Sequence, residues 1–124
     1  MPEQDKSGLL HFATLAEANK ARQLVWGGDK QGPLYRAVEL GGEVGEVLNV
    51  VKKLEREKME LPGSRATVAD LEDELGDAVI CIELLAAKYG IDTQRAAAIK
   101  FNKTSEKLGF PHRVFVPPML EPKQ

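Results

Sequence analysis

Cysteine, histidine and tryptophan are scarce in this sequence: the 124 residues include one cysteine, two histidines and one tryptophan. A single cysteine excludes a disulfide within the chain. The histidines, His11 and His112, lack the close spacing of a metal-binding pair. Dinucleotide-binding glycine motifs, P-loops and paired-cysteine motifs are absent from the sequence. Cys81 lies in an apolar stretch, so we interpret it as a buried structural thiol rather than a nucleophile.

Strong net charge and long apolar runs are also lacking. The net charge of −2 gives no electrostatic basis for binding nucleic acid or a membrane surface. No run of about 18 apolar residues predicts a membrane span. The polar start of the chain lacks the apolar core of a signal peptide. Since 43% of the residues are hydrophobic, we expect one cytoplasmic domain, residues 1–124, with neither a nucleic-acid nor a membrane partner.

What the sequence does contain is helical periodicity, and it predicts an all-α fold. Thr14, Thr67 and Asp92 are suitable N-caps, and Pro33 suits the first turn of a helix. The expected helices cover residues 14–26, 33 to about 55–58, 67–89 and 92–108. The helical core therefore spans about 14–109, and residues 1–8 are expected to be disordered or loosely attached.

Two other segments complete this expected architecture. A long, mobile loop containing the turn signal Leu61-Pro62-Gly63-Ser64 is expected to join the second and third helices. The tail, residues 110–124, is apolar and broken by prolines, so it is expected to be extended. The second half of the third helix, residues 78–87, is apolar on almost every side. Since one small chain can hardly bury such a helix, we expect a subunit interface there.

Two acidic signatures flank the long loop. Glu43 and Glu46 share a face of the second helix, and Glu74 and Asp77 share a face of the third, because residues three apart are neighbours on a helix. An antiparallel arrangement of the two helices makes these four carboxylates converge. Converging carboxylates repel one another unless a cation binds, and Mg²⁺ prefers such oxygen ligands. Glycines beside the acids, each costing roughly 1 kcal/mol in a helix, indicate close approach by a ligand or another helix. The glycines are Gly41, Gly42, Gly45 and Gly76.

The spacing Glu43-x-x-Glu46 followed by Glu74-x-x-Asp77 resembles the MazG-like branch of the all-α nucleoside triphosphate pyrophosphohydrolases. The resemblance covers roughly residues 34–109. It implies a four-helix bundle completed by oligomerisation, as a homodimer or homotetramer. Many members have a further glutamate where this chain has Gly42, and Glu39, one turn before Glu43, is the candidate replacement.

The resemblance also implies an activity: Mg²⁺-dependent cleavage of nucleoside triphosphates to monophosphate and pyrophosphate, which clears surplus or non-standard nucleotides. The four acids of the signatures would be the catalytic and metal-binding residues, and Mn²⁺ is the alternative ion. Lys53 follows the acidic row along the second helix and is a candidate phosphate ligand. Trp26 either packs in the core or stacks on a nucleobase. The resemblance adds Lys100, Asn102 and Lys103 as substrate-binding residues.

The same predicted helices are compatible with a second class of function. In this alternative, the protein is a non-catalytic helical oligomer whose acidic face binds a basic partner. This alternative explains the apolar third helix but does not explain the glycines beside the acids. The sequence leaves open the preferred base and the carboxylate that acts as general base.

Overall fold

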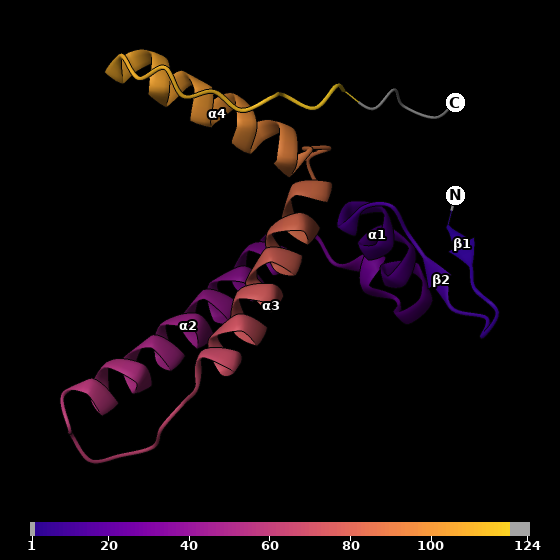
Figure 1. The fold of residues 1–124 in the computed structure, drawn as a ribbon. Coiled ribbons are helices and arrows are strands. Elements are labelled where there is room, and N and C mark those ends of the chain that lie inside the picture. Colours follow the sequence, from indigo (N-terminus) through magenta and orange to yellow (C-terminus); the bar gives the residue numbers. More distant parts are fainter. Residues whose placement is uncertain (1, 120–124) are drawn as a thin grey trace.

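The computed structural model describes residues 2–119, and within them lie four α-helices (Figure 1). These are α1 (Leu15–Trp26), α2 (Pro33–Lys58), α3 (Val68–Ala87) and α4 (Thr93–Leu108). A 3-10 turn, η1 (Gly28–Lys30), follows α1. A short hairpin of β1 (Glu3–Gln4) and β2 (Leu10–His11) precedes α1. The predicted all-α class is confirmed, with this hairpin as an addition.

The helices α1, α3 and α4 begin where the sequence predicts, because their N-cap side chains accept backbone hydrogen bonds. Thr14 accepts a hydrogen bond from the backbone N–H of Glu17. Thr67 and Asp70 exchange the two hydrogen bonds of a capping box at the start of α3. Asp92 caps α4 in the same way as Thr14 caps α1. The end of α3 differs slightly from the prediction, since the helix ends at Ala87 and a turn continues to residue 90.

The helices α2 and α3 form a long antiparallel pair joined by the loop 59–67 (Figure 1). Arg56 holds this loop to the end of α2 by donating to the carbonyl oxygen of Ser64 at 2.9 Å. The predicted end of the second helix and the length of the loop are confirmed. The helix α1 packs against α3, where Asn19 donates a hydrogen bond to the carbonyl oxygen of Ile80.

The N-terminal hairpin corrects one of the two expectations for residues 1–8, because residues 3–8 form β1 and its turn rather than a disordered segment. Its turn is organised by Asp5, whose carboxylate accepts hydrogen bonds from the backbone N–H of Ser7 at 2.8 Å and of Leu9 at 3.1 Å. The same carboxylate pairs with His11 at 2.6 Å. Hydrogen bonds from the Ser7 and His11 side chains are the largest causes that lower the pKa of Asp5 to about 2. The turn sequence from Asp5 to Gly8 was the local signal for this element.

The helix α4 projects from the end of α3, and the chain then turns back along it (Figure 1). The Thr93 hydroxyl donates to the carboxylate of Glu83, which ties the start of α4 to α3. Both amide atoms of Asn102 bond the backbone of Val114, at 2.9 and 2.8 Å. Arg95 donates to the carbonyl oxygen of Pro117 at 2.9 Å. The predicted non-helical tail is confirmed as far as residue 119, and its remainder lies outside the described residues.

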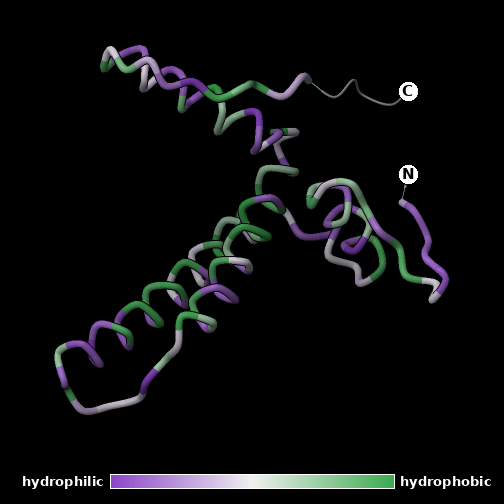
Figure 2. Tube along the Cα trace, in the orientation of Figure 1, coloured by the Kyte–Doolittle hydropathy of each residue, from purple (hydrophilic) through white to green (hydrophobic). Residues whose placement is uncertain are grey.

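The apolar core of the described chain is thin. Its buried apolar residues are Val50, Ala78, Cys81, Leu84, Ala86 and Ala98. Many large apolar side chains of the α2–α3 pair are exposed instead, among them Leu34 at 79%, Leu48 at 62% and Val79 at 47%. Hydrophobic residues recur along both helices of the pair (Figure 2). Because α4 stands apart, residues 2–119 of a single chain do not close a four-helix bundle. Over the same residues, no helix has the length and apolarity that crossing a bilayer requires.

Candidate metal centre and the cavity beside it

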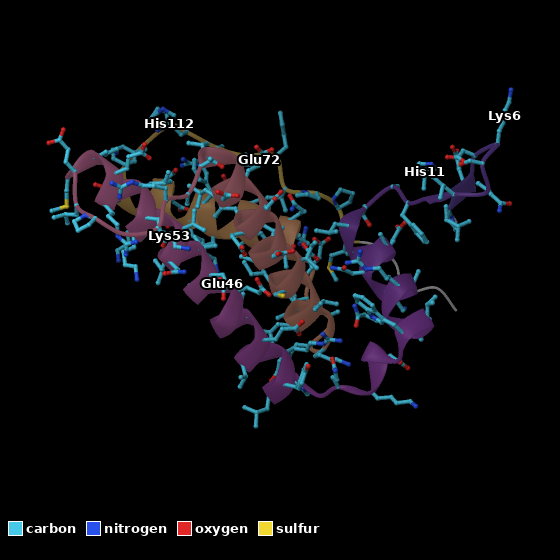
Figure 3. All side chains as sticks on the ribbon, turned by 90° about the horizontal axis from the view of Figure 1, so that it is seen from below. Lys6, His11, Glu46, Lys53, Glu72 and His112 are labelled. Atoms are coloured by element: carbon cyan, nitrogen blue, oxygen red, sulfur yellow. The ribbon has the colours of Figure 1, made fainter. Side chains whose placement is uncertain are left out.

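The antiparallel register of α2 and α3 brings the two acidic signatures together. One carboxylate oxygen from each of Glu43, Glu74 and Asp77 lies within 4.8 Å of the others. Glu46 lies on α2 (Figure 3), and its negative charge contributes, after partial burial, to raising the pKa of Glu74. Three of the four predicted carboxylates therefore converge as potential ligands, and the fourth contributes charge from the same face.

The electrostatics of Glu74 reflect this crowding. Partial burial is the largest cause that raises the pKa of its carboxyl group above 4.5, followed by the charges of Glu46, Asp77, Glu43 and Asp73. A carboxylate that favours its proton in this way also gains from a bound cation. The three converging groups offer hard oxygen atoms, and that donor set fits Mg²⁺ or Mn²⁺ better than a thiol-preferring metal.

Glu39 lies one turn before Glu43, yet it is oriented toward other partners. Arg36 donates to its carboxylate at 2.7 Å. The Cys81 thiol lies close enough to the same carboxylate for the Glu39 charge to act on it. Burial, and then the charges of Glu39 and Glu43, raise the pKa of Cys81 to about 11. Cys81 is thus a buried, protonated thiol, as predicted, and Glu39 stands beside the triad rather than within it.

A cavity of about 190 Å³ adjoins Glu39 where α1, η1 and the start of α2 meet. Arg36 is its central residue and is only 3% exposed. The guanidinium donates through Nη2 to Gln23 Oε1 and to the carbonyl oxygen of Gly28, both at 2.6 Å. The lining residues are Gln23, Trp26, Gly28, Gln31, Tyr35, Arg36 and Glu39.

Trp26 lies at the rim of this cavity and does not pack in the core of the described chain. Its side chain is 64% exposed, and the Arg22 guanidinium lies 5.2 Å from its ring centroid. Of the two roles that the sequence left open, the structure removes core packing. The exposed ring remains able to stack on a flat ligand.

The other predicted substrate residues lie apart from the triad. Lys53 is half-buried on α2, two turns beyond Glu46, and its charge contributes to lowering the pKa of Asp70 (Figure 3). Lys100 and Lys103 are exposed on α4, which the chain holds away from α2 (Figure 1). Both amide atoms of Asn102 are occupied by the tail. Within one chain the structure therefore groups the acids and leaves the α4 residues elsewhere.

The sequence did not predict that Arg36 and Gln23 belong to the cavity. The spacing of Arg36 and Glu39, three residues apart on one helix, was the available signal for their ion pair. Gln23 gave no signal, because its contact with Arg36 depends on how α1 folds back onto α2.

Comparisons with family models, with curated proteins and with solved structures found no match to this chain.

Proposed function

We propose that this protein is a Mg²⁺-dependent nucleoside triphosphate pyrophosphohydrolase. The observation that carries the proposal is the convergence of Glu43, Glu74 and Asp77 within 4.8 Å, with Glu46 on the same face. A solvated acidic face needs no such convergence, since separated charges are more stable in water. The cavity next to the triad supports the proposal because it offers room for a second part of the same substrate.

In the proposed reaction, water attacks the α-phosphorus and the bond from that atom to the α–β bridging oxygen breaks. Pyrophosphate leaves with the bridging oxygen, and a monophosphate remains. The bound Mg²⁺, or Mn²⁺ in its place, would neutralise phosphate charge and lower the pKa of the attacking water. Glu43, Glu46, Glu74 and Asp77 would hold the ion, and a carboxylate of this group or Glu39 would accept the proton of the water. Lys53 and Trp26 would contact the substrate from α2 and α1.

In this proposal the protein acts as a homodimer or homotetramer. Exposed apolar residues follow one stripe along α2, at Leu34, Val38 and Leu48. Gly41 and Gly45 lie on the same stripe, and a Cβ atom at either position would meet nothing within 4 Å in this chain. A second copy is the natural partner for this stripe, because large exposed apolar patches are uncommon on monomers.

Charge gives this second copy an orientation. Residues 93–119, which form α4 and the tail, contain five Lys or Arg and a single acid, Glu106. On the facing acidic surface of α2 and α3, neither Glu46 nor Glu74 forms an ion pair with a basic residue among residues 2–119. The α4 helix of one copy would therefore lie near the acidic row of the other, where Lys100 and Lys103 would meet the triphosphate.

The test is pyrophosphate release with Mg²⁺ across the standard and modified nucleoside triphosphates. Glu46→Gln and Asp77→Asn keep side-chain shape and remove charge, so we expect near-complete loss of hydrolysis with an unchanged circular dichroism spectrum. Glu57→Gln, at an exposed position of α2, is the matched control. Calorimetric titration with Mg²⁺ separates this proposal from the basic-partner alternative. The absence of saturable heat at millimolar Mg²⁺ would reject the proposal. Unchanged turnover in both variants would also reject it.

A further inference from the structure

An apolar cavity of about 340 Å³ lies between the N-terminal hairpin, α1 and α3, and it shares no lining residue with the cavity at Arg36. Most of its walls are apolar side chains, and one of them, Val25, is 88% exposed. A dry cavity of about 150 Å³ with walls of this kind binds benzene. The space therefore admits a large apolar side chain. The apolar lining residues include Leu10, Phe12, Leu15, Ala18, Val25 and Ile80.

Asn19 adds a hydrogen-bond acceptor to this apolar cavity. Its side chain is only 4% exposed, and its Nδ2 donates to the carbonyl oxygen of Ile80 at 3.3 Å. A backbone carbonyl only accepts, so this contact fixes the orientation of the amide. The other amide atom, Oδ1, receives no hydrogen bond from residues 2–119 and is not sealed from solvent. An occupant that fits the cavity is therefore apolar and carries a hydrogen-bond donor.

The tail of the chain presents a side chain of this kind. The ring of Phe115 is 98% exposed, on a segment that runs back along α4 (Figure 1). On one side of it, both amide atoms of Asn102 bond the backbone of Val114. On the other side, Arg95 donates to the carbonyl oxygen of Pro117. The backbone N–H of Phe115 itself donates to no acceptor among residues 2–119. The tail thus holds an apolar ring and an unpaired donor in a fixed position.

We propose that this cavity binds Phe115 from a second copy of the chain, and that Asn19 accepts a hydrogen bond from the tail backbone there. A ring that is 98% exposed in its own chain does not occupy its own cavity. Because the tail is already held to α4, it loses less conformational entropy when it docks than a free segment would. Each copy carries both the ring and the cavity, so two copies exchange tails reciprocally about a two-fold axis.

Charge complementarity favours a second copy as the source of the ring. Residues 93–119, which carry the tail, contain five Lys or Arg and one acid, whereas residues 2–92 contain 11 Lys or Arg and 17 Asp or Glu. The basic segment of one copy is therefore attracted to the acidic part of another, and two basic segments repel each other. Since Ile80 lies one turn after Asp77 on α3, a docked tail also brings α4 near the acidic residues. The proposed function uses the same arrangement for Lys100.

The direct test detects contacts between two chains by NMR. Protein labelled with ¹³C is mixed with unlabelled protein after partial unfolding and refolding. We expect nuclear Overhauser effects between the Phe115 ring of one copy and the methyl groups of Leu15, Val25 and Ile80 of the other. If these contacts appear only in uniformly labelled protein, the tail lies in its own chain and the proposal is wrong. Contacts of the same methyl groups with α2 of the second copy would also overturn it.

Two variants test the ring and the cavity separately. Phe115→Ala removes an exposed ring and should leave the fold intact, and Ala18→Phe fills the cavity from within its own chain. Both should weaken self-association at least tenfold in analytical ultracentrifugation, because burial of a phenylalanine ring changes a binding constant by about that factor or more. The controls are Tyr89→Ala, which removes another exposed ring, and Ala16→Phe, at an exposed position of α1. Both controls should associate like the wild type.

Wild-type association in both Phe115→Ala and Ala18→Phe, or a monomeric wild type, would overturn the proposal. A small apolar molecule that stays in the cavity through purification, detected by native mass spectrometry, would identify another occupant and overturn it as well. Pyrophosphate release is measured separately. Release by a protein whose Phe115 ring stays exposed would reject this inference alone, and a docked ring without release would reject the proposed function alone.

Discussion

Glu74 on α3 lies within the electrostatic influence of Glu46 on α2, across the antiparallel helix pair, and its carboxyl pKa is raised above 4.5. Partial burial is the largest cause and the charge of Glu46 the second. A group whose pKa is raised by folding favours the folded state most at low pH. That contribution is lost as pH rises through the folded-state pKa, so an ionised Glu74 reduces the stability of the metal-free protein near pH 7.

The double variant Glu43→Gln with Glu74→Gln should therefore melt at a higher temperature than the wild type without metal at pH 7. The physical reason is the removal of two charges from a crowded cluster. The difference should shrink as pH falls, because Glu74 then takes up its proton in the wild type. Thermal melts between pH 4.5 and 7.5 in a chelator measure this effect. A metal-free double variant that melts lower than the wild type would show that these carboxylates do not converge.

Mg²⁺ should stabilise the wild type and leave the same double variant unchanged. A ligand that binds only the folded state adds about 2.7 kcal/mol at a hundredfold excess over its dissociation constant. Scanning calorimetry with and without Mg²⁺ measures the shift, and a non-hydrolysable nucleotide should increase it. Amide exchange at Gly42, Gly45 and Gly76 should be faster without the metal than elsewhere in the same helices. An equal shift in the double variant would place the ion at another site.

The hairpin has the opposite pH dependence. Folding lowers the pKa of Asp5 from 3.8 to about 2 through hydrogen bonds from Ser7, His11 and the backbone. This contribution is fully present above pH 3.8 and is lost as pH falls through about 2. NMR signals of Glu3 and Leu10 should therefore report hairpin opening in that range, and Asp5→Asn should open the hairpin already at neutral pH. A hairpin that persists in Asp5→Asn would contradict the role of this carboxylate.

Local signals made much of this fold predictable. Caps such as Thr67 and Asp92 act within one turn of the chain, so the sequence identifies them directly. The acidic register was predictable because two periodic helices and one loop determine it. The cavity was not, since the contact of Arg36 with Gln23 depends on the angle between α1 and α2. The direction of α4 was not predictable either. Its exposed apolar residues do not pack against another helix of the described chain, so they do not determine where α4 lies.

That exposed apolar surface predicts an oligomer that a single charge should disrupt. Leu48 is 62% exposed and lies on the same stripe as Gly41 and Gly45. Leu48→Glu would place a charge in the interface, where burial of an unpaired carboxylate is costly. Light scattering at micromolar concentration should show an oligomer for the wild type and a monomer for the variant. Glu57→Lys, at an exposed position of the same helix that lies off this stripe, is the control and should remain oligomeric. A monomeric wild type would contradict the proposed assembly.

The proposed orientation of the second copy makes a sharper prediction, because Lys100 would then act on the acidic row of its partner. Lys100→Ala should reduce kcat/KM about tenfold or more, since a hydrogen bond to a charged group is worth about 1.5–3 kcal/mol. The melting temperature should change little, because Lys100 is exposed and no hydrogen bond or ion pair involves it within the described chain.

Asp77→Asn should be almost inactive by itself. In a mixed oligomer of the two variants, one site has both an intact triad and a wild-type Lys100 from its neighbour. Mixing the two proteins after partial unfolding and refolding should therefore restore activity toward one quarter of wild type in a dimer, the share that random pairing predicts for such sites. Mixed oligomers with no more activity than the separate variants would show that Lys100 serves the triad of its own chain or none, and the proposed orientation would then be wrong.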